Sequence, residues 1–116
     1  MGNPVVHFEV VGQDANKLHD FYGQLFDWKI NADNPMNYGI VEKGEGGIGG
    51  GIAGGAEGAG HVTFYVEVDD PQAYLDRAES LGGRTVMSVT EIPGMVTFAL
   101  LADPEGHVVG VVQSAS

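Results

Sequence analysis

The chain contains no cysteine. Disulfide bonds, thiolate metal ligands and cysteine nucleophiles are therefore excluded together. A membrane-spanning helix requires about 18 consecutive apolar residues, and the chain has no apolar run of that length. Its start, Met1-Gly2-Asn3-Pro4, lacks the basic residues and the apolar stretch of a signal peptide. We therefore expect a cytoplasmic protein that neither crosses nor binds a membrane.

Basic residues are scarce, with 5 Lys and Arg against 16 Asp and Glu and a formal net charge of −11. Such a surface repels phosphate backbones, so nucleic acid is not an expected partner. Few bases are available to build a pocket for an anionic ligand, and a cationic or neutral ligand suits the field better. The alternative is that the acidity only keeps the protein soluble.

The 116 residues, 43% of them hydrophobic, suit a single domain with one core. A strand at 5–11 precedes a helix capped by Asp14, and three short extended segments follow. The pattern returns with a strand at 61–68, a helix opened by Asp70-Pro71 and closed by Gly82-Gly83, and three more strands. We predict two βαβββ modules, at about 1–57 and about 58–116, that arose by duplication.

A glycine-rich stretch covers residues 44–60 and matches GxGxxG twice, at Gly44-Gly46-Gly49 and Gly49-Gly51-Gly54. A dinucleotide-binding loop needs a helix that starts at this point, with its N-terminus facing the pyrophosphate. The sequence of residues 53–60 does not favour a helix, so nucleotide binding is not expected. We read a short strand around 48–53 and then a linker.

Side chains alternate across a strand, and this assigns the faces of the two module-opening strands. In the first, Phe8 and Val10 lie opposite His7 and Glu9. In the second, the apolar face comprises Val62, Phe64, Val66 and Val68, and the opposite face His61, Thr63, Tyr65 and Glu67. The apolar faces should pack against the helices. We therefore predict an α+β fold with a cupped, mostly antiparallel sheet, helices on its convex face, and a polar cup for a small molecule.

Several other side chains admit two readings. His7 and His61 open the first strand of each module, where they are either metal ligands or ordinary satisfied histidines. Four aromatic residues could line a pocket for a flat or cationic ligand: Trp28, Tyr38, Tyr65 and Phe98. The alternative is that Trp28 and Phe98 belong to the core. We expect His19 on the solvent side of its helix and His107 outside the cup.

The chain resembles the vicinal oxygen chelate superfamily, which includes glyoxalase I, extradiol dioxygenases, fosfomycin-resistance thiol transferases and bleomycin-resistance proteins. The resemblance rests on His7-Phe8-Glu9-Val10, on Phe21-Tyr22-x-x-Leu25-Phe26-x-Trp28, on Leu81-Gly82-Gly83 and on Asp103-Pro104-Glu105-Gly106-His107. It covers nearly the whole chain, and the turn that begins at Asp103 is its most specific part. The family fold is two βαβββ modules that form a cup, often with a divalent metal.

The resemblance also implies a set of metal ligands. His7 and His61 match the two histidine ligands, but Gly110 stands where the family pattern has a glutamate. The fourth-strand ligand of the glyoxalase type is missing as well, because that region reads Gly49-Gly50-Gly51-Ile52-Ala53. Glu9, or Glu67 on the same inferred face, could replace the missing carboxylate.

Two functions follow as hypotheses. The first is a small-molecule-binding protein of the glyoxalase or bleomycin-resistance type without the usual catalytic metal and with no other cofactor. Its ligand would lie among His7, Glu9, His61, Thr63, Tyr65, Glu67 and Gly110. The alternative is a metal-dependent isomerase, lyase or thiol transferase that uses His7, His61 and Glu9. We expect a homodimer in either case, because curled sheets leave exposed edges and family members commonly pair.

Overall fold

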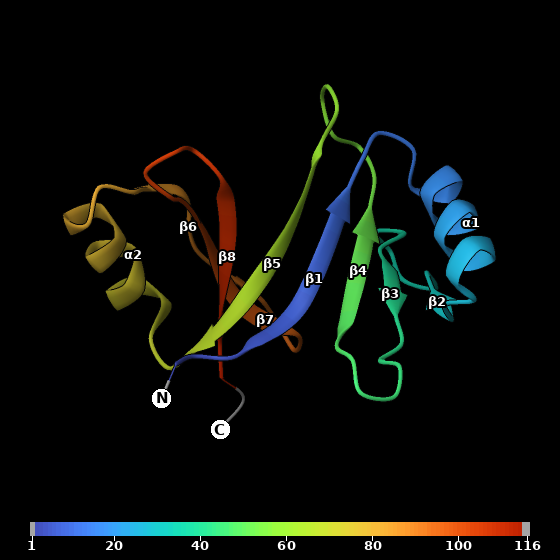
Figure 1. Ribbon diagram of the computed structural model, residues 1–116, viewed down its shortest axis with the longest axis horizontal. Coiled ribbons are helices and arrows are strands. Elements are labelled where there is room, and N and C mark those ends of the chain that lie inside the picture. The colour runs from blue at the N-terminus through green and yellow to red at the C-terminus, as the bar shows by residue number, and fades with distance from the viewer. Residues whose placement is uncertain (1, 115–116) are drawn as a thin grey trace. The chain divides into compact units, whose positions relative to one another are not determined.

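The computed structural model describes residues 2–114. The elements, in chain order, are β1 (Val5–Val11), α1 (Ala15–Phe26), β2 (Ile30–Asn31), β3 (Gly39–Val41), β4 (Gly49–Ala53), β5 (His61–Val68), α2 (Pro71–Ser80), β6 (Arg84–Ile92), β7 (Val96–Ala102) and β8 (Val108–Gln113) (Figure 1). The βαβββ order therefore occurs twice, which confirms the predicted α+β fold. The chain forms two compact units: the first unit is His7–Thr63, and the second unit is Met1–Val6 with Phe64–Ser116.

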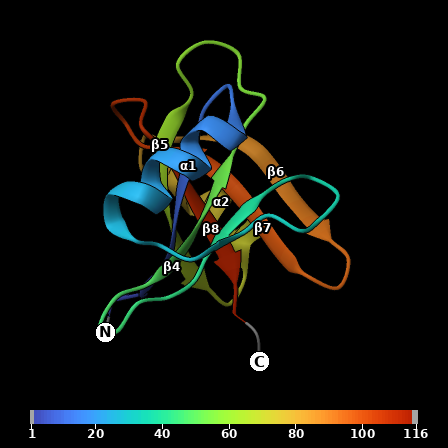
Figure 2. The same ribbon diagram turned by 90° about the vertical axis from the view of Figure 1, so that its right-hand side faces the viewer.

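In the first unit the strands lie in the order β2-β3-β4-β1. The β1–β4 pair is parallel, whereas β2–β3 and β3–β4 are antiparallel. Helix α1 contacts β4. The ribbon views show it lying along one face of this sheet (Figures 1 and 2). The core between them consists of Val10, Val41 and Ile52 with Phe8, Leu18, Tyr22, Trp28 and Ile30 around them. Trp28 is thus a core residue, stacked on Tyr22.

The second unit repeats this plan with the strand order β5-β8-β7-β6. Again one pair is parallel, β5–β8, and the other two are antiparallel. Helix α2 packs against β6, β7 and β8. The core consists of Val68, Leu75, Ala99 and Val111, with Val66, Tyr74 and Leu101 packed against them.

The helix boundaries lie where the sequence predicts them. Asp14 and Asp70 both have extended backbones and cap their helices, accepting hydrogen bonds from the backbone N–H groups of Lys17 and Ala73. Gly82 ends α2 with a left-handed φ of 97°, which a glycine adopts without steric cost. No helix within residues 2–114 has the length and apolar character needed to cross a membrane.

Two apolar surfaces are less buried than the sequence predicts. On α1, Phe21, Leu25 and Phe26 are more than half exposed, because the helix contacts its core through Leu18 and Tyr22. On β5, Val62 is 72% exposed, whereas Val68 is buried. The ten-residue helix α2 packs only against the C-terminal part of that strand. The prediction that this whole face of β5 is buried against a helix is therefore wrong for Val62 and Phe64.

His19 also differs from its predicted place. It is half-buried, and its Nε2 lies 3.1 Å from the carbonyl oxygen of Ile52 in β4. A Cβ added to Gly39 would lie 2.4 Å from the same nitrogen. His19 thus fills the space over a glycine between the helix and the sheet. An isolated histidine beside an apolar stripe gives no signal for such packing.

Candidate functional site

Three polar side chains meet on the sheet face of the first unit that points away from α1. His7 and Glu9 alternate with the core residues Phe8 and Val10 along β1, so they lie on the opposite face. Tyr38, just before β3, places its hydroxyl 2.9 Å from His7 Nε2 and donates a 2.9 Å hydrogen bond to Glu9 Oε2. We call this group the His7–Tyr38–Glu9 array.

Glycine in β4 makes room for the Tyr38 side chain. Gly51 pairs with Glu9 across the β1–β4 ladder. A Cβ built on Gly51 would lie 1.7 Å from the Tyr38 hydroxyl oxygen, so the tyrosine occupies the space that any larger residue would need. The glycine-rich stretch therefore forms the floor under a tyrosine, which is a use different from the phosphate loop that the GxGxxG pattern suggests.

Asn34 holds the backbone of Tyr38 from both sides. Its side-chain oxygen accepts a 3.0 Å hydrogen bond from the Tyr38 N–H, and its amide nitrogen donates a 2.8 Å bond to the Tyr38 carbonyl. The intervening Asn37 has a left-handed φ of 52°, a conformation that asparagine tolerates better than most residues. This turn fixes where the Tyr38 side chain leaves the backbone.

The direction of the hydrogen bonds sets the tautomer of His7. Tyr38 has one hydroxyl hydrogen, and it is donated to Glu9. The hydroxyl oxygen therefore accepts from His7, whose Nε2 carries the hydrogen. Burial lowers the pKa of His7, and the nearby charge of Glu9 opposes this shift only in part. The imidazole is thus neutral at neutral pH, with a hydrogen on Nε2 and a lone pair on Nδ1.

In the second unit the corresponding face is closed by an aromatic ring. Tyr65 pairs with Gly110 across the β5–β8 ladder and is only 8% exposed. A Cβ on Gly110 would lie 2.3 Å from the Tyr65 ring, and Phe98 meets the same ring edge-on at 6.2 Å between centroids. A glutamate at position 110, as in the family pattern, would therefore have no room for its side chain while the Tyr65 ring lies over this position.

The structure distributes the remaining predicted site residues as follows. Thr63 is buried, Glu67 is half-buried, and His61 is exposed at the start of β5. Glu67 donates its backbone N–H to Pro4 within the second unit. Across residues 2–114, no three His, Asp or Glu side chains come together in a group that could hold a metal ion. His7 and Glu9 thus converge on Tyr38, but they do not form a three-ligand site with His61.

His107 lies outside both arrangements. It is an exposed residue of the turn before β8, where its Nδ1 lies 3.0 Å from Asp103 Oδ2. Asp103 also accepts hydrogen bonds from the backbone N–H groups of Glu105 and His107. The backbone bond from His107 is the main reason that the pKa of Asp103 lies below its ordinary value. The Asp-Pro-Glu-Gly sequence is therefore a turn, as its residue types predict.

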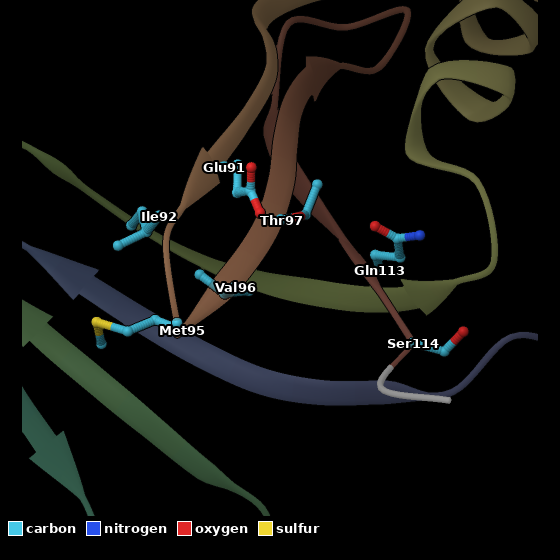
Figure 3. Close-up of a pocket in the computed structure, with 8 residues that line it drawn as sticks. Glu91, Ile92, Met95, Val96, Thr97, Gln113 and Ser114 are labelled. Carbon is cyan, nitrogen blue, oxygen red and sulfur yellow. The ribbon is translucent and has the colours of Figure 1, made fainter.

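Two surface pockets of the described residues lie away from the array. One, of about 250 Å³, lies at the β6–β7 hairpin, where Figure 3 shows Glu91, Met95, Thr97 and Gln113 around it. The other, of about 540 Å³, lies at the start of α1 and is lined by Gln13, Asp14, Ala15, Asn16, Met36, Asn37, Gly54 and Gly55. Their linings contain no histidine, so the candidate site is the hydrogen-bonded array.

Tyr38 and Asn34 are the two site residues whose roles the sequence does not reveal. The sequence names Tyr38 only as one of four aromatic residues that could line a pocket, without linking it to His7 or Glu9. The available signal is Gly51, because a glycine inside a strand often marks a close approach by another group. The sequence does not say which side chain approaches, and Asn34 reads only as part of a turn.

Comparisons with known proteins agree with this fold. The sequence model of the glyoxalase-like domain family matches residues 7–112. Two curated proteins named "Putative glyoxylase CFP32", from Mycobacterium bovis and Mycobacterium tuberculosis, are each 31% identical over 81 residues. The match covers 69% of this chain but 31% of theirs, so the chain spans about a third of the relatives' length.

Solved structures show the same fold at low identity. A hypothetical protein from Bacillus halodurans C-125 has a TM-score of 0.72 at 12% identity, over 100% of this chain and 97% of that one. Methylmalonyl-CoA epimerase from Mycobacterium tuberculosis has a TM-score of 0.69 at 14% identity, over 97% and 88%. A glyoxalase/bleomycin resistance protein/dioxygenase superfamily member from Vibrio splendidus 12B01 has 0.66 at 17%, over 97% and 100%. With the family match across residues 7–112, the chain belongs to the glyoxalase-like domain family.

Proposed function

We propose that this glyoxalase-like protein binds a small molecule without the catalytic metal of its superfamily. The observation that carries the proposal is the pairing of Tyr65 with Gly110. The ring covers the position where the family pattern has its carboxylate ligand. A metal held by the two histidines alone would lack the carboxylate oxygen that hard divalent ions prefer.

The first unit supports the same proposal. The Tyr38 hydroxyl already contacts both His7 Nε2 and Glu9 Oε2 at 2.9 Å. A cation coordinated by these two atoms would have to displace the tyrosine from its place over Gly51. The array therefore serves hydrogen bonding with a ligand and not coordination of a metal.

Metal analysis of the purified protein tests this function. We expect no stoichiometric metal and no change in the unfolding temperature on addition of zinc, manganese or nickel. His7→Ala should leave this result unchanged, as should His107→Ala, which removes an exposed histidine from a turn. Stoichiometric metal that is lost in His7→Ala but kept in His107→Ala would overturn the proposal.

A metal-dependent enzyme is the second candidate, and one observation favours it. His7 and Glu9 lie close enough to share a single hydroxyl group, so a rotation of Tyr38 would leave a nitrogen and a carboxylate facing one point. This candidate predicts that Tyr38→Phe binds zinc more tightly than the unchanged protein does. Isothermal titration of both proteins decides between the two functions.

The proposal includes a homodimer. It is supported by the apolar side chains left exposed on β5 and α1, of which Val62 is the most exposed. Sedimentation equilibrium measures the mass in solution. A monomer at all concentrations would remove this part of the proposal without affecting the metal-free site.

A further inference from the structure

A row of three polar side chains crosses one end of the sheet in the second unit. Glu91 on β6 pairs with Thr97 on β7. The β7–β8 ladder pairs Phe98 with Val112. Thr97 and Gln113 are the next residues along these two strands, so they lie opposite each other. Neighbouring strands are about 4.8 Å apart, so the row is about 10 Å long. We call Glu91, Thr97 and Gln113 the polar row (Figure 3).

The polar row lies on the sheet face that α2 covers further along. Every second residue of a strand lies on the same face. Thr97 therefore shares its face with Ala99, and Gln113 shares its face with Val111. Both of these buried residues belong to one core with Leu75 of α2. Two of the three row residues are nevertheless exposed, so the helix leaves this end of the face open.

The side chains of the polar row have no hydrogen-bond or salt-bridge partner within residues 2–114. Other polar side chains on the same edge strand are satisfied by protein atoms. Thr85 donates its hydroxyl hydrogen to Glu79, and Thr90 donates to the carbonyl oxygen of Ser88. The carboxylate, the hydroxyl and the amide of the row can therefore all bond to a ligand.

The polar row lines the pocket at the β6–β7 hairpin, which has a volume of about 250 Å³. Pockets for drug-sized ligands have about 300–1,000 Å³, so this one suits a smaller molecule. Ser114 adds a second hydroxyl group to the lining. The other four lining residues have no polar side chain: Ile92, Gly94, Met95 and Val96.

This lining offers donors and acceptors but no positive charge. The amide of Gln113 and the hydroxyl group of Thr97 both donate and accept, whereas the carboxylate of Glu91 only accepts. An anion would be repelled by that carboxylate and by the net charge of −11. An ammonium group could donate to Glu91 but could not accept from Gln113. A molecule with several hydroxyl groups can bond to every member of the row, because each hydroxyl group both donates and accepts.

We propose that the polar row binds a small neutral polyhydroxylated molecule of about the size of a six-carbon polyol. One hydroxyl group donates to Glu91, another accepts from the amide of Gln113, and Thr97 bonds to the ligand between them. The bond to the carboxylate is charge-assisted and is the strongest of the three. This site is separate from the His7–Tyr38–Glu9 array, so the inference goes beyond the proposed function.

Four six-carbon probes test the inference on the unchanged protein. Sorbitol, gluconate, hexane-1,6-diol and n-hexylammonium differ in charge or in the number of hydroxyl groups. We expect sorbitol to shift the NMR amide signals of Thr97 and Gln113 saturably, with a Kd on the order of 1 mM. The other three probes should bind at least about tenfold more weakly at these residues. Equal binding of any of them, or no saturable shift with sorbitol, would overturn the inference.

Two variants with matched controls in the same unit then locate the site. Thr97→Val keeps the shape of the side chain and should weaken sorbitol binding about fivefold. Thr90→Val, on β6 outside the pocket lining, should not. Glu91→Gln should weaken sorbitol binding about tenfold, whereas Glu105→Gln, in the exposed turn before β8, should leave it unchanged. Equal losses in a variant and its control would contradict the assignment. Metal analysis is independent of this site: a metal-free protein that does not bind sorbitol contradicts this inference alone.

Discussion

The two units place a tyrosine over a glycine on the same face of their sheets, yet they use it differently. In the first unit Tyr38 reaches Gly51 from the turn before β3, and Glu9 keeps its carboxylate beside it. In the second unit the tyrosine is on β5 itself, and Tyr65 lies directly over Gly110. Glu9 and Tyr65 occupy equivalent positions, since each lies five residues before the N-cap of the next helix.

This difference shows how the same sheet face can carry polar side chains in one module and be covered by an aromatic ring in the other. An aromatic ring on the module-opening strand, such as Tyr65, fills the space over the glycine that pairs with it. It therefore leaves no room for a metal-binding side chain at that glycine position. A carboxylate on that strand leaves the space to a tyrosine from elsewhere, whose hydroxyl then becomes part of a polar array. The choice at a single strand position thus decides which module offers hydrogen-bonding groups.

Truncation of either core should give the largest effect and tests whether the units are equally well packed. Ile52 in the first unit and Leu75 in the second are almost fully buried. Ile52→Ala and Leu75→Ala should each lower the free energy of unfolding by about 2–5 kcal/mol, because each leaves a cavity. Chemical denaturation measures the loss.

Phe21→Ala serves as the control, since this side chain is 56% exposed. It should cost less than about 1 kcal/mol. If Ile52→Ala cost as little as Phe21→Ala, the first unit would have no tightly packed core. The expectation that both units are well packed would then be wrong.

The glycine pair should give the next largest effect and separates the two tyrosines. Gly110→Ala places a Cβ under the buried ring of Tyr65, which has little room to move, and should destabilise by about 1–3 kcal/mol. Gly51→Ala meets the far end of the Tyr38 side chain, which is less buried than Tyr65 and can shift, so the loss should stay below about 1 kcal/mol.

Gly44→Ala is the matched control, because an added Cβ there meets nothing within 4 Å. It should be neutral or slightly stabilising. Equal losses in Gly51→Ala and Gly110→Ala would show that Tyr38 is held as rigidly as Tyr65. The melting temperature of the four proteins decides.

The next effect is the dependence of stability on pH, which should differ between His7 in the first unit and His107 in the second. The folded-state pKa of His7 lies below the ordinary value of 6.5, so the unfolded chain takes up this proton first as the pH falls. The stability from a neutral His7 is complete above pH 6.5 and is lost as the pH drops through the folded-state pKa. His7→Gln should flatten that part of the stability–pH curve.

His107→Gln, on the exposed turn of the second unit, is the comparison variant. Denaturation at a series of pH values gives the slopes. If His7→Gln and the unchanged protein had the same slope below pH 6.5, burial of His7 would not matter to folding.

The smallest effect should come from the exposed turn of the second unit. The pKa of Asp103 lies below its ordinary value of 3.8, chiefly through the backbone hydrogen bond from His107. Its contribution is therefore complete above pH 3.8 and lost as the pH falls below that value. Asp103→Asn should remove this dependence on acid with little change at neutral pH, measured by thermal unfolding. A large loss at neutral pH would contradict the assignment of this segment as a simple turn.

Much of the fold could be predicted from the sequence because its signals are local. Asp14, Asp70 and Gly82 mark helix ends through their own backbone and side-chain chemistry. Alternation along β1 correctly separates His7 and Glu9 from the core. The apolar stripe of α1 is longer than the part of the helix that the sheet covers, however, so Phe21, Leu25 and Phe26 remain exposed. Periodicity predicts which face of a helix is apolar but not how much of that face a sheet covers.

The sequence by itself determined two βαβββ modules, an acidic chain, and a glycine at position 110 where the family pattern has a carboxylate. Only the tertiary structure decided what covers that glycine and what joins His7 to Glu9. Tyr65 is brought over Gly110 by the pairing of β5 with β8, and Tyr38 over Gly51 by a turn that Asn34 holds. Strand register sets the first contact and a turn sets the second. Each contact joins different parts of the chain, so no local pattern of residues specifies it.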